Sequence, residues 1–376
     1  MTSQPGERQA VIAVVIPSFR VKMHILSVIA GIGEECSLIY VVDDRCPESS
    51  GQYVLDHCRD PRVTVIFHEE NQGVGGAVLS GYQQAVADGA TVIVKIDGDG
   101  QMDPAWIPAL VTDIATGVAD YAKGDRFYDR ESVGSMPRIR VFGNAVLSFL
   151  TKISSGYWDI VDPTNGFTAI DGTVAGTLPY SKISRRYFFE SDMLFRLGIM
   201  RARVVDIPMP AIYGDEESGL SIRKIVGEFL AKHTMNTLKR VLYTYYVRSF
   251  SVASVELIVG LLMLIFGVTF GTVTWINNAV VGQETSSGTV MLAALPAMLG
   301  LQLLLAFLAA DISSVPTHAI GRRLGLIRPQ QAGRRPATPE GVSRVAAVGD
   351  GRMLDADAGS SSPREAMGQV SNGNPR

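Results

Sequence analysis

The sequence predicts an α/β fold in which helices cover both faces of a mostly parallel sheet. About the first hundred residues alternate short β-branched runs with helical patterns, and the segments between the runs are long enough for crossover helices. The expected strands are 11–17, 38–44, 63–69 and 92–99. Ligands of such sheets bind beyond the carboxyl ends of the strands. The residues that fall there are Pro17, Asp43, Asp44, Asp97 and Asp99.

The composition indicates that part of the chain lies in lipid. Hydrophobic residues make up 47% of the 376 residues and charged residues only 19%. The net charge of −3 gives no general reason to expect nucleic acid as a partner. Cys36, Cys46 and Cys58 lack the spacing of metal ligands and are expected to be free thiols in a reducing compartment. The N-terminal residues lack the pattern of a signal peptide, so we expect the first domain to stay in the cytoplasm.

Changes in composition along the chain predict its organisation. An N-terminal arm over 1–10 precedes an α/β domain over 11–220 and amphipathic juxtamembrane helices over 221–250. Two transmembrane helices are expected within 251–312, and a cytoplasmic, largely disordered tail over 313–376. The tail is rich in Pro, Gly, Ser, Arg and Ala and lacks periodicity, which is typical of disorder.

The membrane prediction depends on three neighbouring segments. Residues 221–248 carry six Lys and Arg against one acid, Glu228, with aromatic residues interleaved. Such a helix lies at a membrane surface or, alternatively, is an ordinary surface helix. The uncharged segments at about 257–275 and 290–310 each approach the roughly 20 residues that cross a bilayer, a buried core hairpin being the alternative. Basic residues flank this pair but are absent from its connection, which predicts an integral protein of the inner (plasma) membrane with both termini cytoplasmic.

The stretch VKIDGDGQMDP places three carboxylates directly after an apolar run. A calcium loop of the EF-hand type does not fit, because Met102 and Pro108 stand where that loop needs Gly and Glu. Asp97 and Asp99 instead suit one divalent cation, Mg²⁺ or Mn²⁺, that also holds a diphosphate, with Gln101 as a further oxygen donor. A second acidic pair, Asp43 and Asp44, at the end of another expected strand strengthens this interpretation.

A glycine-rich stretch, NQGVGGAVLSGYQQA at 71–85, has two interpretations. It resembles a phosphate-binding loop that opens a helix, yet it lacks the Lys-Ser/Thr of a P-loop and the spacing of G-x-G-x-x-G. The glycines can equally allow tight packing of a helix on the sheet. Both interpretations stay open at the level of sequence.

The order of these motifs resembles glycosyltransferase family 2. The shared features are a strand that ends in Pro17, the VVDD strand, N-x-G-x-x-x-A-x-x-x-G from Asn71 and D-x-D-x-Q from Asp97. KGDR, R-x-x-x-N and DPTNGF, farther along, are similar to the dolichol-phosphate mannosyltransferase branch, which includes bacterial polyprenyl-phosphate glycosyltransferases. The resemblance spans about 11–310 and implies the GT-A fold, a nucleotide-sugar donor and a polyprenyl-phosphate acceptor. Some members of that branch carry a two-helix C-terminal anchor.

The resemblance also implies roles for residues that match these motifs. The nucleotide sugar is expected to contact Pro17, Asp43, Asp44, Asn71, Gly73 and Asp97, and the metal Asp97, Asp99 and Gln101. The acceptor phosphate is expected to contact Arg126 and Arg140, with Arg223 and Lys224 aligned more loosely. Two positions depart from the family pattern. Arg20-Val21 replace the usual Asn-Glu, which removes an acidic base contact, and Ser218-Gly219 replace the usual Ser-Lys.

The expected chemistry makes modest demands on a general base. A metal ion neutralises the departing diphosphate, and a phosphate monoester is largely ionised near neutral pH because its second pKa is about 6. The catalytic set is therefore Asp97 and Asp99 for the metal, with Arg126 and Arg140 to position the acceptor phosphate. Asp162, Glu190 and Asp192 are candidates for a sugar contact, for a base if the acceptor is an alcohol, or for a purely structural role.

The sequence thus predicts a membrane-anchored and metal-dependent transferase, and the resemblance implies that it inverts the sugar carbon. A lipid-linked saccharide or a glycolipid is the alternative acceptor. A non-catalytic scaffold that binds a nucleotide sugar is the alternative from another class, which the effect of Asp99→Asn on turnover separates from an enzyme. Membrane lipid is the expected partner, and Gly260, Gly267 and Gly271 suggest helix association or a homo-oligomer.

Overall fold

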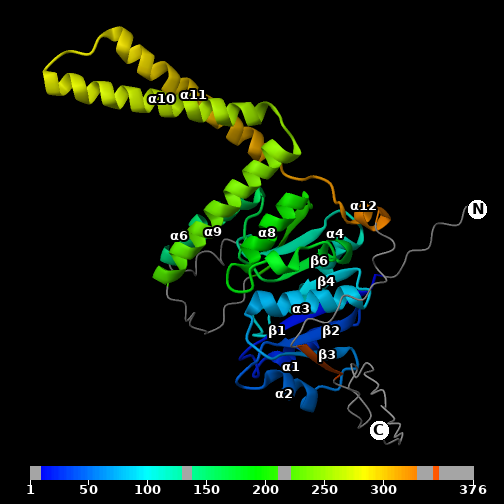
Figure 1. The fold of residues 1–376 in the computed structure, drawn as a ribbon. Helices are drawn as coiled ribbons and strands as arrows, with labels where there is room; N and C mark the ends of the chain where they lie inside the picture. The colour runs from blue at the N-terminus through cyan, green and yellow to red at the C-terminus, as the bar shows by residue number, and fades with distance from the viewer. Residues whose placement is uncertain (1–9, 129–137, 211–221, 328–341, 347–376) are drawn as a thin grey trace, which may run out of the picture.

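The predicted α/β fold is confirmed by the computed structural model, which describes residues 10–128, 138–210, 222–327 and 342–346 (Figure 1). Side chains of 138–142, 222–226, 326–327, 342, 344 and 346 lie outside that description. One mixed sheet has the strand order β7-β5-β6-β4-β1-β2-β3-β8. Its strands are β1 Ile12–Ser18, β2 Cys36–Asp43, β3 Val63–His68, β4 Val92–Lys95, β5 Tyr121–Asp125, β6 Thr168–Asp171, β7 Val204–Pro208 and β8 Val342–Ala346.

The sheet combines a parallel half with a mixed half. Strands β3, β2, β1 and β4 run parallel to one another, as their β-branched runs predict. Beyond β4 the direction changes, because β6 runs antiparallel to both β4 and β5, while β7 is parallel to β5. At the other edge β8 pairs antiparallel with β3. The two halves meet between β4 and β6.

Helices cover both faces of the sheet. Side chains of β1 alternate between two cores, so that Val14 and Ile16 enter one and Ala13 and Val15 the other. The first core lies under α1 Ile25–Gly31, α2 Ser50–His57 and α4 Ile107–Ala115, with the short η1 Pro104–Trp106 before α4. The second lies under α3 Val74–Ala87, α7 Gly172–Ala175 and α8 Phe189–Met200, with η2 Tyr180–Lys182 before α8.

Five further helical elements lie outside these two layers. Helices α6 Arg138–Ser155 and α9 Ile222–Leu242 pack together, and η3 Tyr243–Arg248 continues α9 as a turn of π-helix. Helices α10 Val252–Val281 and α11 Ser287–Ser313 then form a hairpin that projects from the α/β domain (Figure 1). Both are long and apolar enough to cross a membrane, judged by length and composition. They contain the segments 257–275 and 290–310 that the sequence analysis selected.

Small residues join the two helices of the hairpin. A Cβ atom on Gly267 would lie 2.6 Å from the backbone nitrogen of Ala297, and one on Gly260 would lie 3.1 Å from the carbonyl oxygen of Gly300. The backbones therefore approach too closely for larger side chains. The glycines of α10 therefore allow α10 and α11 of one chain to pack closely, which is the helix association that the glycine pattern predicts.

The chain returns to the α/β domain after α11. Backbone N–H groups of Ile320 and Gly321 donate to the Asp120 carboxylate, and α12 Gly321–Ile327 packs against α7. This part of the tail departs from the expected disorder because Ile320 and Leu324 pack against the second core. Strand β8 departs from it as well, since it pairs with β3. Residues 328–341 and 347–376 lie outside the described residues.

Candidate active site

A cleft of about 760 Å³ opens at the carboxyl ends of β1, β2 and β4. This is the edge at which the sequence predicts a ligand, since parallel strands present their carboxyl ends together. The predicted residues that line the cleft are Pro17, Asp44, Asn71, Gly73, Asp97 and Asp99. Arg20, Arg45, Arg186 and Tyr187 also line it and were not predicted as site residues.

Asp44 shapes the wall of the cleft through its hydrogen bonds. Its buried carboxylate accepts hydrogen bonds from the backbone N–H groups of Gln72 and Gly73, at 2.8 and 2.7 Å. Its Oδ1 also lies 2.8 Å from Nδ1 of His68, and its carbonyl oxygen accepts from the Asn71 side chain at 3.0 Å. The carboxylate predicted to contact the nucleotide therefore holds the glycine-rich loop in place.

Asp43 faces away from the cleft. Its carboxylate oxygens accept from the backbone N–H groups of Cys46 and Gly51, at 2.7 and 2.6 Å, and Asp43 is not among the residues that line the cleft. Successive side chains at a strand end point to opposite sides, so only one of two adjacent aspartates reaches the ligand. The geometry does not bring Asp43 to the predicted nucleotide site.

The geometry of the glycine-rich loop is compatible with both interpretations that the sequence left open. Gly73 precedes the first turn of α3 with φ of +83°, and it lines the cleft together with Val74 and Ala77. The helix N-terminus thereby borders the cleft, where its N–H groups and dipole favour an anion. Gly81, by contrast, is a packing residue, because a Cβ there would lie 2.3 Å from a methyl group of Val15.

Asp97 and Asp99 reach the same cleft from the turn after β4. Asp97 is 27% exposed, and its Oδ1 lies 2.8 Å from Nζ of buried Lys95. Asp99 Oδ1 accepts from the backbone N–H of Gln101 at 2.9 Å. Within the described part of the chain no group of three or more His, Cys, Asp and Glu side chains could hold a metal ion. Two carboxylates at an open cleft nevertheless fit a divalent ion that takes its remaining oxygen ligands from a diphosphate and water.

Lys95 joins Asp97 to a second acidic residue. Its Nζ lies 3.6 Å from Glu190 Oε1 at the start of α8. Burial lowers the pKa of Lys95, but the neighbouring carboxylates Asp97 and Glu190 outweigh this effect and raise it. Lys95 is therefore a fixed positive charge beneath the two carboxylates. The sequence analysis missed it because a lysine inside a strand resembles an ordinary solvated residue.

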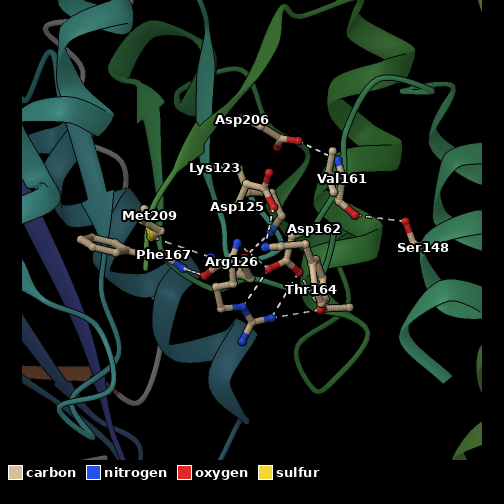
Figure 2. A network of polar contacts seen from close by, with 12 residues as sticks. Lys123, Asp125, Arg126, Ser148, Val161, Asp162, Thr164, Phe167, Asp206 and Met209 are labelled. Atoms are coloured by element: carbon tan, nitrogen blue, oxygen red, sulfur yellow. Dashed lines mark hydrogen bonds and ion pairs between the residues drawn. The ribbon is translucent and has the colours of Figure 1, made fainter. Parts of the chain in front are cut away.

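A half-buried ion pair joins Arg126 to Asp162 (Figure 2). Arg126, after β5, donates from Nε to Asp162 Oδ2 at 2.7 Å and from Nη2 to Asp162 Oδ1 at 3.2 Å. The Asp162 side chain is fully buried, whereas that of Arg126 is 34% exposed. Burial raises the pKa of Asp162, but the guanidinium of Arg126 outweighs this effect and lowers it. Asp162 therefore orients Arg126, an arrangement suited to binding an anion.

The chain segment DPTNGF connects this pair to the carboxylates. A Cβ on Gly166 would lie 2.8 Å from Asp97 Oδ2 and 2.3 Å from Lys95 Nζ. Arg126 and Gln101 line a small hollow beside this segment. Gln101, predicted as a metal ligand, is thus placed next to Arg126 and is not among the residues that line the larger cleft.

Further buried charges surround the ion pair. Lys123 donates to the carbonyl oxygen of Asn165, and burial lowers the pKa of Lys123 to about 8. Asp206 on β7 accepts from the backbone N–H of Val161 at 2.6 Å (Figure 2), and burial raises its pKa to about 6. These two residues were not predicted, because their partners lie far away in the sequence.

The other predicted residues fall into two groups. The carboxylate of Asp192 is buried and accepts from the backbone N–H of Ser184 and from the side chain of Asn236, which indicates a structural role. Arg140 belongs to α6, and Arg223 and Lys224 belong to α9, but their side chains lie outside the described residues.

Comparison with known proteins identifies the family of the α/β domain. Residues 14–177 match the sequence model of the family described as glycosyl transferase family 2. These residues form a domain of this family, as the resemblance predicts, and the protein is a glycosyltransferase. The match contains β1 to β4, the cleft carboxylates and the Arg126–Asp162 pair.

Relatives with named activities are 27–28% identical to the chain over the aligned residues. The chain is 28% identical over 166 residues to UDP-N-acetylglucosamine–dolichyl-phosphate N-acetylglucosaminyltransferase of Methanococcus voltae, covering 44% of this chain and 66% of the relative. It is 27% identical to undecaprenyl-phosphate mannosyltransferase of Micrococcus luteus, covering 52% and 80%. Among solved structures, glucosyl-3-phosphoglycerate synthase of Mycobacterium tuberculosis with Mn²⁺ and uridine diphosphate aligns with 18% identity and a TM-score of 0.45, covering 64% of this chain and 86% of that one.

Proposed function

We propose that this glycosyltransferase moves a sugar from a nucleotide sugar to a polyprenyl phosphate at the cytoplasmic surface of the inner membrane, with inversion at the sugar carbon. The observation that carries this proposal is the contact at Gly166, where the segment that holds Arg126 touches Asp97. A donor site and an anion-binding site then share one wall. The printed names of the relatives, which act on dolichyl or undecaprenyl phosphate, support the acceptor class.

In the donor half, the residues position a diphosphate. Asp97 and Asp99 would hold a divalent ion, Mg²⁺ or Mn²⁺, which supplies charge neutralisation to the leaving diphosphate when bound. The N-terminus of α3, held by Asp44, borders the same cleft and favours a phosphate group there. Arg186 adds a positive charge to the cleft wall.

In the acceptor half, the residues position a nucleophile that needs little activation. A phosphate monoester is largely ionised near neutral pH because its second pKa is about 6. Arg126 would bind this phosphate in an orientation fixed by Asp162, so that a phosphate oxygen faces the sugar. Glu190, next to Lys95, would contact a sugar hydroxyl. No proton transfer from the acceptor to a side chain is then required.

The helices outside the α/β domain support a location at the membrane. The hairpin of α10 and α11 has the length and composition of a membrane anchor. Apolar side chains are also exposed on the neighbouring helices, among them Val146 and Phe149 of α6 and Leu238 of α9. An acceptor with a polyprenyl chain is confined to the bilayer, so an anchored enzyme searches a surface for it. Helix α9 and the hairpin of α10 and α11 would thus both hold the active site at the membrane surface.

The decisive experiment measures transfer to lipid. Detergent-purified protein is incubated with Mg²⁺ or Mn²⁺, undecaprenyl phosphate and labelled UDP-glucose, UDP-galactose, UDP-N-acetylglucosamine or GDP-mannose in turn. We expect one donor to yield an acid-labile labelled lipid, and we expect EDTA to abolish it. A donor that is bound or hydrolysed without labelling the lipid would refute the acceptor and favour a glycolipid. If none of these nucleotide sugars is bound and none is hydrolysed, the donor half of the proposal is contradicted.

A further inference from the structure

Asp311 is an unusual residue for its position. It lies in the last turn of α11, whose other side chains are largely exposed and apolar, yet only 2% of its side chain is exposed. Of the residues of α11, Gly300 and Asp311 are the buried ones. A carboxylate is removed from water at the end of an apolar helix only where it has strong partners.

Three other elements supply those partners. Arg240 of α9 donates from Nη1 and Nη2 to the two carboxylate oxygens of Asp311, at 2.7 and 3.0 Å. The hydroxyl of Tyr245 in η3 donates to Oδ1 at 2.7 Å, and the indole Nε1 of Trp158 donates to Oδ2 at 2.9 Å. Arg240 also donates to the carbonyl oxygen of Ile153 in α6. We call Asp311, Arg240, Tyr245 and Trp158 the Asp311 junction.

Helix α9 is arranged around this junction. Its buried side chains are polar and recur at His233, Asn236 and Arg240, while apolar Leu238 and Leu242 are exposed. His233 Nδ1 lies 2.9 Å from Ser154 Oγ, and Asn236 donates to Asp192 at 3.2 Å. The helix therefore makes specific polar contacts with the α/β domain, which fix its rotation and register more sharply than apolar packing would.

The junction continues into the acceptor half of the site. Trp158 begins a short segment in which Val161 N–H donates to Asp206 and Asp162 binds Arg126. The carbonyl oxygen of Trp158 also accepts from Lys152 Nζ at 2.9 Å, which attaches the segment to α6. Only three residues thus separate the tryptophan that contacts the hairpin from the aspartate that orients Arg126.

We propose that the Asp311 junction positions Arg126 relative to the apolar hairpin, and hence relative to an acceptor phosphate held in the bilayer. The junction residues are positioning residues, because none of them lines the cleft or the hollow beside Arg126. A buried ion pair contributes little net stability compared with apolar packing, but it accepts only one geometry. Such a geometric constraint is what a membrane-bound acceptor requires. This inference rests on the proposed function.

The test compares two acceptors on the full-length protein in lipid nanodiscs. One acceptor is undecaprenyl phosphate in the same bilayer, and the other is a short-chain, water-soluble prenyl phosphate. For Asp311→Asn we expect KM for the embedded acceptor to rise about tenfold, with KM for the soluble acceptor and for the donor unchanged. Ser313→Ala, an exposed position two residues later on the same helix, is the matched control and is expected to leave all three constants unchanged.

Trp158→Phe provides a second variant that leaves no buried charge unpaired. It removes the indole donor and keeps an aromatic ring, so we expect a smaller rise in the same KM. If Asp311→Asn fails to fold, the KM values of Trp158→Phe for the two acceptors test the proposal on their own. An equal rise in KM for both acceptors would indicate a merely structural role and overturn the proposal. An unchanged KM for both acceptors would overturn it as well.

Hydrogen exchange separates this inference from the proposed function. We expect Asp311→Asn and Trp158→Phe to accelerate amide exchange in 156–165 while β1 to β4 keep their protection. Unchanged exchange in 156–165 in a folded variant would overturn the inference, whatever the activity. If the parent protein labels no polyprenyl phosphate, the proposed function fails, and the exchange data still decide whether the junction holds this segment.

Discussion

The donor half and the acceptor half of the site are built in different ways. In the donor half, Asp44, Asp97 and Asp99 lie just beyond the ends of parallel strands. Asp44 and Asp99 accept hydrogen bonds from backbone N–H groups, as Asp44 does from Gly73. In the acceptor half, charged side chains from β5, β7 and the intervening loop neutralise one another, as for Arg126 with Asp162. The first half depends on strand ends and the second on buried charge pairs. We therefore expect substitutions in the donor half and in the acceptor half to change different kinetic constants.

The largest expected effect is on turnover in the donor half. Asp99→Asn keeps the side-chain volume and removes one charge from the carboxylate pair, so we expect transfer to fall about 100-fold or more, as on removal of a group that stabilises developing charge. Asp56→Asn, on the exposed surface of α2, is the matched control. The measurement is the initial rate of lipid labelling, with circular dichroism to verify folding. A rate within twofold of the parent would exclude Asp99 from the reaction.

The next effect separates acceptor from donor binding. Arg126→Lys keeps a positive charge but loses the two-point contact with Asp162, so we expect KM for the acceptor to rise about ten- to a hundredfold. KM for the nucleotide sugar should stay within about twofold. Steady-state kinetics with each substrate varied in turn measures both. Equal increases in the two constants would show that Arg126 does not belong to a separate acceptor half.

The two adjacent aspartates after β2 allow a matched comparison. Asp44→Asn weakens hydrogen bonds that hold the cleft wall, whereas Asp43→Asn weakens similar bonds outside the cleft. We expect each to lower the free energy of unfolding by about 1.5–3 kcal/mol, the range for hydrogen bonds to a charged group. KM for the donor should rise only for Asp44→Asn. Thermal unfolding and donor kinetics test this, and a donor effect from Asp43→Asn would contradict the placement of the cleft.

The smallest expected effect concerns Asp206. Burial raises its pKa from 3.8 to about 6, so the folded protein holds a proton that the unfolded chain has already released. Stability from this group is therefore present below about pH 4 and is lost as the pH rises through about 6. Asp206→Asn, which resembles the protonated form, should raise stability by about 1 kcal/mol at pH 8 relative to pH 4, after allowance for partial solvent exposure. A pH-independent difference in the unfolding midpoint would contradict this cause.

The sequence by itself determined the parallel half of the sheet and most of the donor site. Strands with β-branched runs and their crossover helices are local patterns, and residues such as Asp97 and Asp99 reach the cleft because they follow a strand end. The apolar segments of the hairpin are equally local, since their length and lack of charge are visible in the sequence.

Only the tertiary structure decided which charges face one another. Asp43 and Asp44 are adjacent in the sequence, yet only Asp44 lines the cleft, because a strand end directs neighbouring side chains apart. Lys95 and Lys123 are buried beneath the site by contacts with Glu190 and Asn165, which lie far away along the chain. Asp311 meets Arg240 and Trp158 only once the hairpin packs against α9. Local patterns fix where a strand or helix ends, but burial and charge pairing depend on which distant segments the fold brings together.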